Sequence, residues 1–257
     1  MPETVSAQLT PLTKPLHIRL TSSPVGLPDD LIEKIAAHWD TLTAQNPHLF
    51  NGDAFTVTGY IDAAEAIEVE VAETKYAHNL YSEAHDAGKY SFKVIHSACL
   101  VVTSDNKFVV GEMGLHTARA GQICCSGGGI DRGDIRGNII DLDHSTTHEL
   151  QEELGISPYD EHAVSFRPAY MVSGGPLGKI TVAYELRTDL SSAAFKKHYG
   201  AFTRQLAATG KDSEFGRILF VDNTLDAIEE FIAAQGDHLD QYIAPLLRAT
   251  SQQTTTA

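Results

Sequence analysis

The amino-acid sequence predicts a mixed α/β fold, in which a small α+β extension precedes a larger α/β or α+β sandwich. Two observations support this fold class. A short series of helix, strand, strand and helix comes first, and β-rich runs then alternate with helical periodicities. The 257 residues are enough for one domain with such an extension. We expect the extension over residues 1–90, the larger domain over 91–250 and a disordered tail over 251–257.

The extension is predicted from four segments. Residues 29–45 have apolar side chains at helical spacing after an acidic start, which is typical of a helix N-terminus. The sequence NPHLFNG then ends that helix. The next two runs, AFTVTGY and AIEVEVAE, alternate like half-buried strands, and a second helix is expected at residues 76–86.

The larger domain begins with HSACLVVTSDNKFVVGEM, two β-rich runs joined by SDNK, which predicts a hairpin. Further strands are expected at AVSFRPAYMVS, KITVAYELR and RILFV. Helical patterns cover residues 144–154, 192–208 and 224–247. These strands and helices predict a layered sandwich.

Composition and charge exclude several classes of function. Hydrophobic residues make up 42% of the chain, and no apolar run approaches the roughly 18 residues of a membrane helix, so we expect no membrane partner. The formal net charge of −15 repels a phosphate backbone and argues against a nucleic-acid partner. The first residues, MPETVSAQLTPLTKPL, lack the pattern of a secretory signal, so a cytoplasmic location is expected.

The three cysteines and the histidines give no zinc pattern. Cys99, Cys124 and Cys125 lie in apolar segments without CxxC spacing, so we expect buried, reduced thiols. The twelve histidines do not form the spaced pairs of a zinc site, and most are expected at the surface.

The segment HELQEELGI, residues 148–156, concentrates negative charge on one helix face. Glu149, Glu152 and Glu153 fall within an arc of about 100°. Like charges at this spacing repel, and no Lys or Arg three or four residues away offsets them. A hard divalent cation would turn the repulsion into coordination. The alternative is a solvated helix face with a Thr146–Glu149 capping box and a C-cap at Gly155.

This segment and the upstream sequence SGGGIDRGD resemble the box of the Nudix hydrolases. That box is a Gly, five residues, a Glu, seven residues and then R-E-U-x-E-E-x-G-U, where U is apolar. Gly128 matches the first Gly and Asp134 stands at the first Glu. The end of the box is matched in order by Glu149, Leu150, Glu152, Glu153, Gly155 and Ile156.

The resemblance implies a Nudix-type αβα sandwich that hydrolyses a diphosphate linked to another moiety with the help of divalent metal. It implies that Glu149, Glu152, Glu153 and the Gly128 carbonyl hold Mg²⁺, with Mn²⁺ as the alternative ion, and that the three glutamates are catalytic. Gly127 and Gly128 are expected to contact substrate. The cations also explain how an acidic protein binds an anionic substrate.

Two positions depart from the family pattern. Thirteen residues separate Asp134 from His148, against seven in the family, so about six are inserted before the catalytic helix. His148 replaces the Arg that braces the glutamates in the family, and imidazole lacks the bidentate fork of Arg. Reduced activity is therefore one hypothesis for this chain.

Later segments supply further candidates. Glu214, in KDSEFGRILFV just before the last strand, is expected to be the additional catalytic or metal-binding Glu that many family members carry, and the alternative is an exposed loop residue. Arg119 is expected to meet a substrate phosphate, with a solvated surface Arg as the alternative. The segment SGGPLGK, residues 173–179, is either a plain hairpin loop or a border of the pocket.

The extension points to a substrate class. Its sequences HWDTLTAQNPHLFNGDAF and YAHNLYSEA are similar to the N-terminal region of Nudix proteins that split UDP-glucose or UDP-galactose into UMP and a sugar 1-phosphate. We therefore expect a metal-dependent diphosphatase acting on a nucleoside diphosphate derivative, with a UDP-sugar as the leading substrate. The alternatives are a noncatalytic nucleotide-binding or regulatory Nudix module and a structural protein with a chance acidic helix. The oligomeric state stays open.

Overall fold

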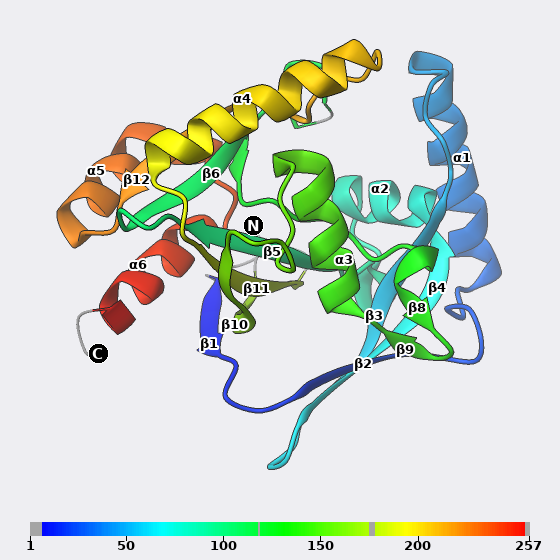
Figure 1. Ribbon diagram of the computed structural model, residues 1–257. Helices are drawn as coiled ribbons and strands as arrows, with labels where there is room; N and C mark the ends of the chain where they lie inside the picture. Colours follow the sequence, from blue (N-terminus) through cyan, green and yellow to red (C-terminus); the bar gives the residue numbers. More distant parts are fainter. Residues whose placement is uncertain (1–6, 118, 175–177, 255–257) are drawn as a thin grey trace.

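Two β-sheets organise the chain (Figure 1). The computed structural model describes residues 7–117, 119–174 and 178–254. Within them, a seven-stranded sheet forms the centre of the larger domain and a five-stranded sheet forms the centre of the extension. In the described residues, no helix is both long enough and apolar enough to cross a membrane.

The seven-stranded sheet has the order β1-β10-β11-β5-β6-β12, with β7 paired to β6. Most neighbours are antiparallel, but β11 and β5 run parallel. Its strands are β1 (Gln8–Pro11), β5 (Ile95–Val102), β6 (Lys107–Met113), β7 (Ile123–Cys124), β10 (Ala163–Gly174), β11 (Lys179–Thr188) and β12 (Phe215–Asp222).

Helices cover both faces of this sheet. The core on one face contains side chains from α3 (Leu142–Glu149), from the π-helical turn η3 (Leu150–Leu154) and from α4 (Ser192–Ala208). The core on the other face contains side chains from α5 (Leu225–Gln235) and α6 (Ile243–Thr254). Alternation along β5 explains this, because Cys99 and Val101 enter the first core and Leu100 and Val102 enter the second. The predicted αβα sandwich is confirmed.

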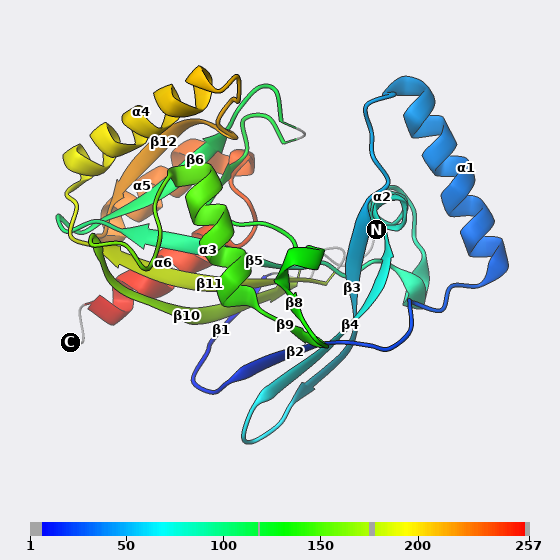
Figure 2. The same cartoon turned by 45° about the vertical axis from the view of Figure 1, so that its right-hand side comes forward.

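The five-stranded sheet has the order β3-β4-β2-β9-β8. Its strands are β2 (Leu16–Leu20), β3 (Asp53–Asp62), β4 (Ile67–Lys75), β8 (Ile135–Arg136) and β9 (Ile139–Ile140). Two helices, α1 (Asp29–Gln45) and α2 (Tyr76–Ala84), pack together around Leu31, Ile35 and Ala77. Figure 2 shows this extension beside the larger domain, with the β8–β9 hairpin between them.

The inserted residues of the box therefore have a structural place. They form the β8–β9 hairpin, in which Arg136 pairs with Ile139. Ile139 also pairs with Arg19 of β2, so the hairpin extends the sheet of the extension. The insertion before the catalytic helix thus joins the extension to the box.

Several boundaries differ from the sequence prediction. Strand β1 pairs with β10, so residues 8–11 belong to the sheet of the larger domain although they precede residue 90. The single helix expected over residues 224–247 is two helices, α5 and α6, because Gly236 at φ 52° and the 3₁₀ turn η4 (Gly236–His238) separate them. Helix α6 continues to Thr254, beyond the predicted start of the tail, and residues 255–257 lie outside the described residues.

Two short 3₁₀ turns complete the chain, η1 (Gly88–Tyr90) before β5 and η2 (Arg132–Asp134) before β8. The cysteines are free: Cys99 and Cys125 are buried and Cys124 is partly buried, which agrees with the sequence prediction of reduced thiols.

Candidate functional site

The glutamates of HELQEELGI lie on the α3–η3 helix. The N-cap is Asp141, whose carboxylate accepts a hydrogen bond from the His144 backbone N–H at 3.0 Å. The predicted capping box at Thr146 is wrong, because the helix begins four residues earlier and the Thr146 hydroxyl donates to the Leu142 carbonyl. The predicted C-cap is confirmed: Gly155 adopts φ 69°, in the left-handed region that favours glycine.

The helix is fixed against the sheet by its apolar side chains. Leu150 and Leu154 are buried in the core beneath it. Beyond its end, a Cβ atom at Gly155 would lie 2.5 Å from the Phe202 ring, so only glycine fits there. This packing orients Glu149 and Glu153, four residues apart, toward the glycine run before β8.

Two contacts join the helix to that glycine run. The Gly127 backbone N–H donates to Glu153 Oε2 at 2.9 Å. A Cβ atom at Gly128 would lie 1.9 Å from Glu149 Oε1, so the carboxylate occupies the space that a side chain would need. The two segments that the sequence motif links, GGG and EEL, are therefore in contact.

Burial and mutual repulsion raise the pKa values of two of these carboxyls. Burial and the negative charge of Glu149 raise the pKa of Glu153 to about 8, and its exposed fraction is 4%. Burial and the charges of Glu214 and Glu152 raise the pKa of Glu149 to about 7. Glu214, an exposed residue just before β12, lies close enough for its charge to raise both pKa values, and its catalytic role stays a prediction.

Glu152 and His148 lie on the outer face of the helix. Glu152 Oε2 is 3.5 Å from His148 Nδ1, and the two side chains are 61% and 52% exposed. His144 stacks on His148 with the ring planes 5° apart and the centroids 6.4 Å apart. In this structure His148 contacts one glutamate, Glu152, through one ring nitrogen.

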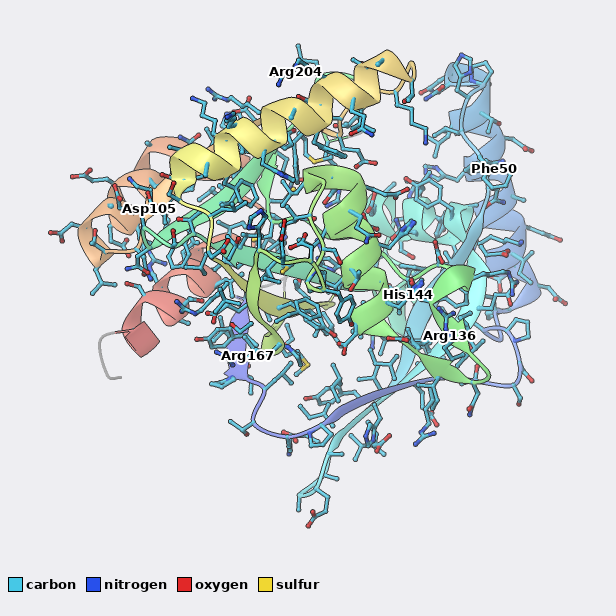
Figure 3. The ribbon with its side chains drawn as sticks, viewed as in Figure 1. Phe50, Asp105, Arg136, His144, Arg167 and Arg204 are labelled. Carbon is cyan, nitrogen blue, oxygen red and sulfur yellow. The ribbon has the colours of Figure 1, made fainter. Side chains whose placement is uncertain are left out.

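Asp134 is buried and its two oxygens are already bound. Oδ2 accepts from the Asp131 backbone N–H at 3.0 Å, and Oδ1 lies 3.0 Å from His144 Nδ1. These contacts hold η2 against the start of α3. Figure 3 shows His144 on α3 and Arg136 on the adjacent hairpin. Asp134 therefore fixes the loop before the helix.

A cavity of about 350 Å³ opens beside Glu153 and Glu214. The larger domain contributes the glycine run and charged residues to its wall, and the extension contributes residues of β3 and α2. Besides those two glutamates, its lining includes Asp53, Phe55, Tyr76, Asn79, His96, Arg119, Gly127, Gly128, Lys179, Asp240 and Tyr242. The predicted site and the extension thus meet at one cavity.

Lys179 and Asp240 are lining residues that the sequence did not single out. Lys179 ends the segment SGGPLGK, of which residues 175–177 lie outside the described residues. Lys179 lines the cavity, and β10 and β11 on either side of the segment pair as a hairpin, so the described residues agree with both readings of it. Lys179 Nζ lies 3.3 Å from Asp240 Oδ2, and the pair is 61 residues apart in sequence. Arg119 also borders the cavity, 3.5 Å from the same Asp240 oxygen.

The carboxylate oxygens of Glu149, Glu152 and Glu153 are ligands of the kind that a hard cation prefers. In the described residues none of the three forms an ion pair with Lys or Arg. As placed, however, no three His, Cys, Asp or Glu side chains of the described residues are grouped to hold a metal ion. The Gly128 carbonyl accepts a hydrogen bond from the Ser97 N–H at 3.1 Å.

Comparisons with known proteins find similar solved structures at low sequence identity. No protein-family model matches the sequence, and no curated protein matches it. Among solved structures, DR0079 from Deinococcus radiodurans has 17% identity and a TM-score of 0.40, over 61% of this chain and 82% of that one. A MutT protein from Methanosarcina mazei has 14% identity and a TM-score of 0.40, over 63% and 95%. An Ap4A hydrolase from C. elegans has 12% identity and a TM-score of 0.39, over 64% and 99%.

Other solved structures that are similar to this chain are named as Nudix hydrolases, among them proteins from Nitrosomonas europaea and Clostridium perfringens, each at 12% identity. The three-layer sandwich, with the box helix on one face and the glycine run against it, is the arrangement that the sequence motif predicts. The chain has an αβα sandwich fold.

Proposed function

We propose that the protein hydrolyses the diphosphate bond of a nucleoside diphosphate linked to another moiety, with UDP-glucose or UDP-galactose as the leading substrate. The observation that carries the proposal is the contact of Glu149 and Glu153 with Gly127 and Gly128 at a cavity of about 350 Å³. Buried carboxylates with raised pKa values and no basic partner are unfavourable for folding, and such groups concentrate at functional sites.

A divalent cation, Mg²⁺ or Mn²⁺, would supply Lewis-acid polarisation of the diphosphate and would lower the pKa of an attacking water. Glu149, Glu152, Glu153 and the Gly128 carbonyl are the residues proposed to hold it, and Glu214 is proposed as an additional ligand or base. Gly127 keeps Glu153 in place through its N–H. In the reaction, a base or the solvent takes a proton from the water, the water oxygen bonds to one phosphorus, and the bond from that phosphorus to the bridging oxygen breaks. Two phosphate monoesters are left.

The extension is proposed to bind the nucleoside or the sugar. Phe55 of β3 and Tyr76 and Asn79 of α2 line the cavity, and Phe55 is 4% exposed. Flat rings suit a nucleobase, and an amide can donate to and accept from its edge. UDP-glucose would then give UMP and glucose 1-phosphate.

A direct test is product analysis with UDP-glucose, ADP-ribose, NADH and CoA, each with and without Mg²⁺. We expect Mg²⁺-dependent formation of UMP from UDP-glucose, and E152Q is expected to lower turnover by at least about tenfold. An E161Q variant, which changes an exposed Glu outside the cavity lining, serves as the matched control. Turnover that survives E152Q unchanged would remove Glu152 from the metal site.

A second candidate function is a noncatalytic nucleotide-binding or regulatory module. Two observations favour it: in the described residues the acidic side chains are not grouped to hold an ion, and His148 contacts one glutamate where the family has Arg. This candidate predicts thermal stabilisation by UDP-glucose or ADP-ribose without turnover. Adding Mg²⁺ or introducing H148R would then produce no hydrolysis.

A further inference from the structure

Two cations share a single carboxylate in the cavity. Lys179 comes from the start of β11, Arg119 from the loop before β7 and Asp240 from the segment before α6. The Asp240 oxygen Oδ2 lies 3.3 Å from Lys179 Nζ and 3.5 Å from Arg119 Nη1. All three residues line the cavity that also reaches Glu153 and Glu214.

Asp240 is fixed by the backbone around it. Its side chain is 6% exposed, and its N–H donates to the Ile123 carbonyl at 2.9 Å. The neighbouring Leu239 forms a bridge with Ile123 of β7. The carboxylate therefore stays at one place in the wall and holds both cations there.

Lys179 is partly removed from water, with 22% of its side chain exposed. Burial lowers the pKa of Lys179, and the charge of Arg119 lowers it further, while Asp240 acts in the opposite direction. The two cations thus repel each other across the carboxylate that they share. Within the described residues, neither has an ion pair with a second acid.

Three other titratable groups of the cavity wall carry no charge beside this pair. His96, on β5, is buried in the same wall, and burial together with the charges of Lys179 and Arg119 lowers its pKa, which keeps the ring neutral. Burial raises the pKa values of the Cys124 and Cys125 thiols, so these groups are neutral as well. Lys179, Arg119 and Asp240 together therefore carry one excess positive charge, and the two cations offer N–H donors to an anion.

We propose that Lys179 and Arg119, held by Asp240, form a phosphate-binding subsite that receives one phosphate of the substrate in the cavity that also reaches Glu153 and Glu214. The inference deepens the proposed function and rests on it for the identity of the substrate. An N–H donor with a positive charge is the group that binds a phosphate oxygen most strongly.

The test is calorimetric titration of the metal-free protein, in EDTA, with inorganic pyrophosphate and with uridine. Wild type is expected to bind pyrophosphate, and K179Q and R119Q are each expected to weaken that binding by about tenfold. K179R, which keeps the charge, is expected to stay within about threefold of wild type. K196Q removes an exposed lysine of α4 outside the cavity lining and is the matched control, expected to leave binding unchanged.

Each outcome decides the proposal. Equal pyrophosphate affinity in K179Q and K196Q overturns it, as does a wild type that releases no heat with pyrophosphate. A loss of uridine binding in K179Q as large as the loss of pyrophosphate binding overturns it too, because the substitution would then have distorted the whole cavity. R119Q changes a 55% exposed side chain, so its effect on pyrophosphate binding decides the proposal if K179Q does not fold.

Failure of the proposed function has a different signature. If wild type binds pyrophosphate through Lys179 but hydrolyses none of the four diphosphate compounds with Mg²⁺, the hydrolase proposal fails and the subsite stands. If hydrolysis proceeds and K179Q has wild-type KM and wild-type pyrophosphate affinity, the subsite fails and the hydrolase proposal stands.

Discussion

Gly128 and Glu149 occupy complementary space, because the glutamate Oε1 fills the position where any larger residue at 128 would place its Cβ atom. This relationship links the glycine run to the box helix at the level of single atoms. It means that a methyl group at residue 128 must displace the carboxylate from the site.

The first prediction uses that displacement. G128A is expected to lower kcat for UDP-glucose by about a hundredfold, because a catalytic group misplaced by about 1 Å costs that order of rate. G129A is the matched control, since a Cβ atom there meets nothing within 4 Å, and its activity is expected to stay near that of wild type. Steady-state kinetics and thermal unfolding check both variants. Equal activities of the two would contradict the close packing at Gly128.

The second prediction concerns the pH dependence of stability without metal. The pKa of Glu153 is about 8 in the folded protein against an ordinary 4.5, so the unfolded chain loses this proton at lower pH. The free energy of unfolding is therefore expected to fall as pH rises from about 4.5 to about 8, by up to a few kcal/mol. Urea unfolding in EDTA at pH 5, 6.5 and 8.5 measures the decline.

The matched variants for this prediction are E153Q and E161Q. E153Q removes the titrating group and keeps an oxygen that can accept from the Gly127 N–H, so its stability is expected to decline less with pH. E161Q changes an exposed glutamate and is expected to follow wild type. If all three proteins lose the same stability between pH 5 and 8.5, Glu153 has no raised pKa.

Segments with a long regular pattern were predicted well from the sequence. Helices α1 and α4 have the predicted bounds, Asp29–Gln45 and Ser192–Ala208, because their apolar residues recur at helical spacing over 17 residues. Strands β8 and β9 were missed, because two residues each are too short for an alternation. Strand β1 ends at a proline, which weakens a strand signal in sequence although it fits the edge of the sheet.

In the site too, residues close in sequence could be predicted to lie together, and residues far apart in sequence could not. Glu149 and Glu153 lie in one helical motif, so their shared face follows from helix geometry. Lys179 and Asp240 are 61 residues apart, and only the path of β11 past the segment before α6 brings them together. The contact between the extension and the box could not be predicted from the sequence either, because Arg19 and Ile139, which pair there, are more than a hundred residues apart.

The third prediction concerns that joint. Arg132 in η2 binds Asp53 of β3 and lies 2.5 Å from Glu73 of β4, and Asp53 borders the cavity. R132Q is expected to raise KM for UDP-glucose by about threefold or more and to leave kcat within about twofold, because it loosens a wall of the cavity and not the box helix. K14Q, which breaks an ion pair with Asp62 inside the extension, is the control and is expected to change neither value. A fall in kcat with unchanged KM in R132Q would show that this joint acts on the chemistry instead.

The last prediction concerns His148, the residue that replaces the Arg of the box. His148 Nδ1 lies 3.5 Å from Glu152 Oε2 in a pair that is more than half exposed, so H148Q is expected to change the free energy of unfolding by less than about 1 kcal/mol. H148R introduces a permanent charge and a bidentate donor next to the glutamates, and it is expected to raise kcat/KM for UDP-glucose by about threefold to tenfold. Steady-state kinetics with saturating Mg²⁺ check this against H148Q, which has neither property. If the wild type is active and H148R is no more active, the glutamates need no Arg to hold them. If neither the wild type nor H148R is active, the result supports the noncatalytic module.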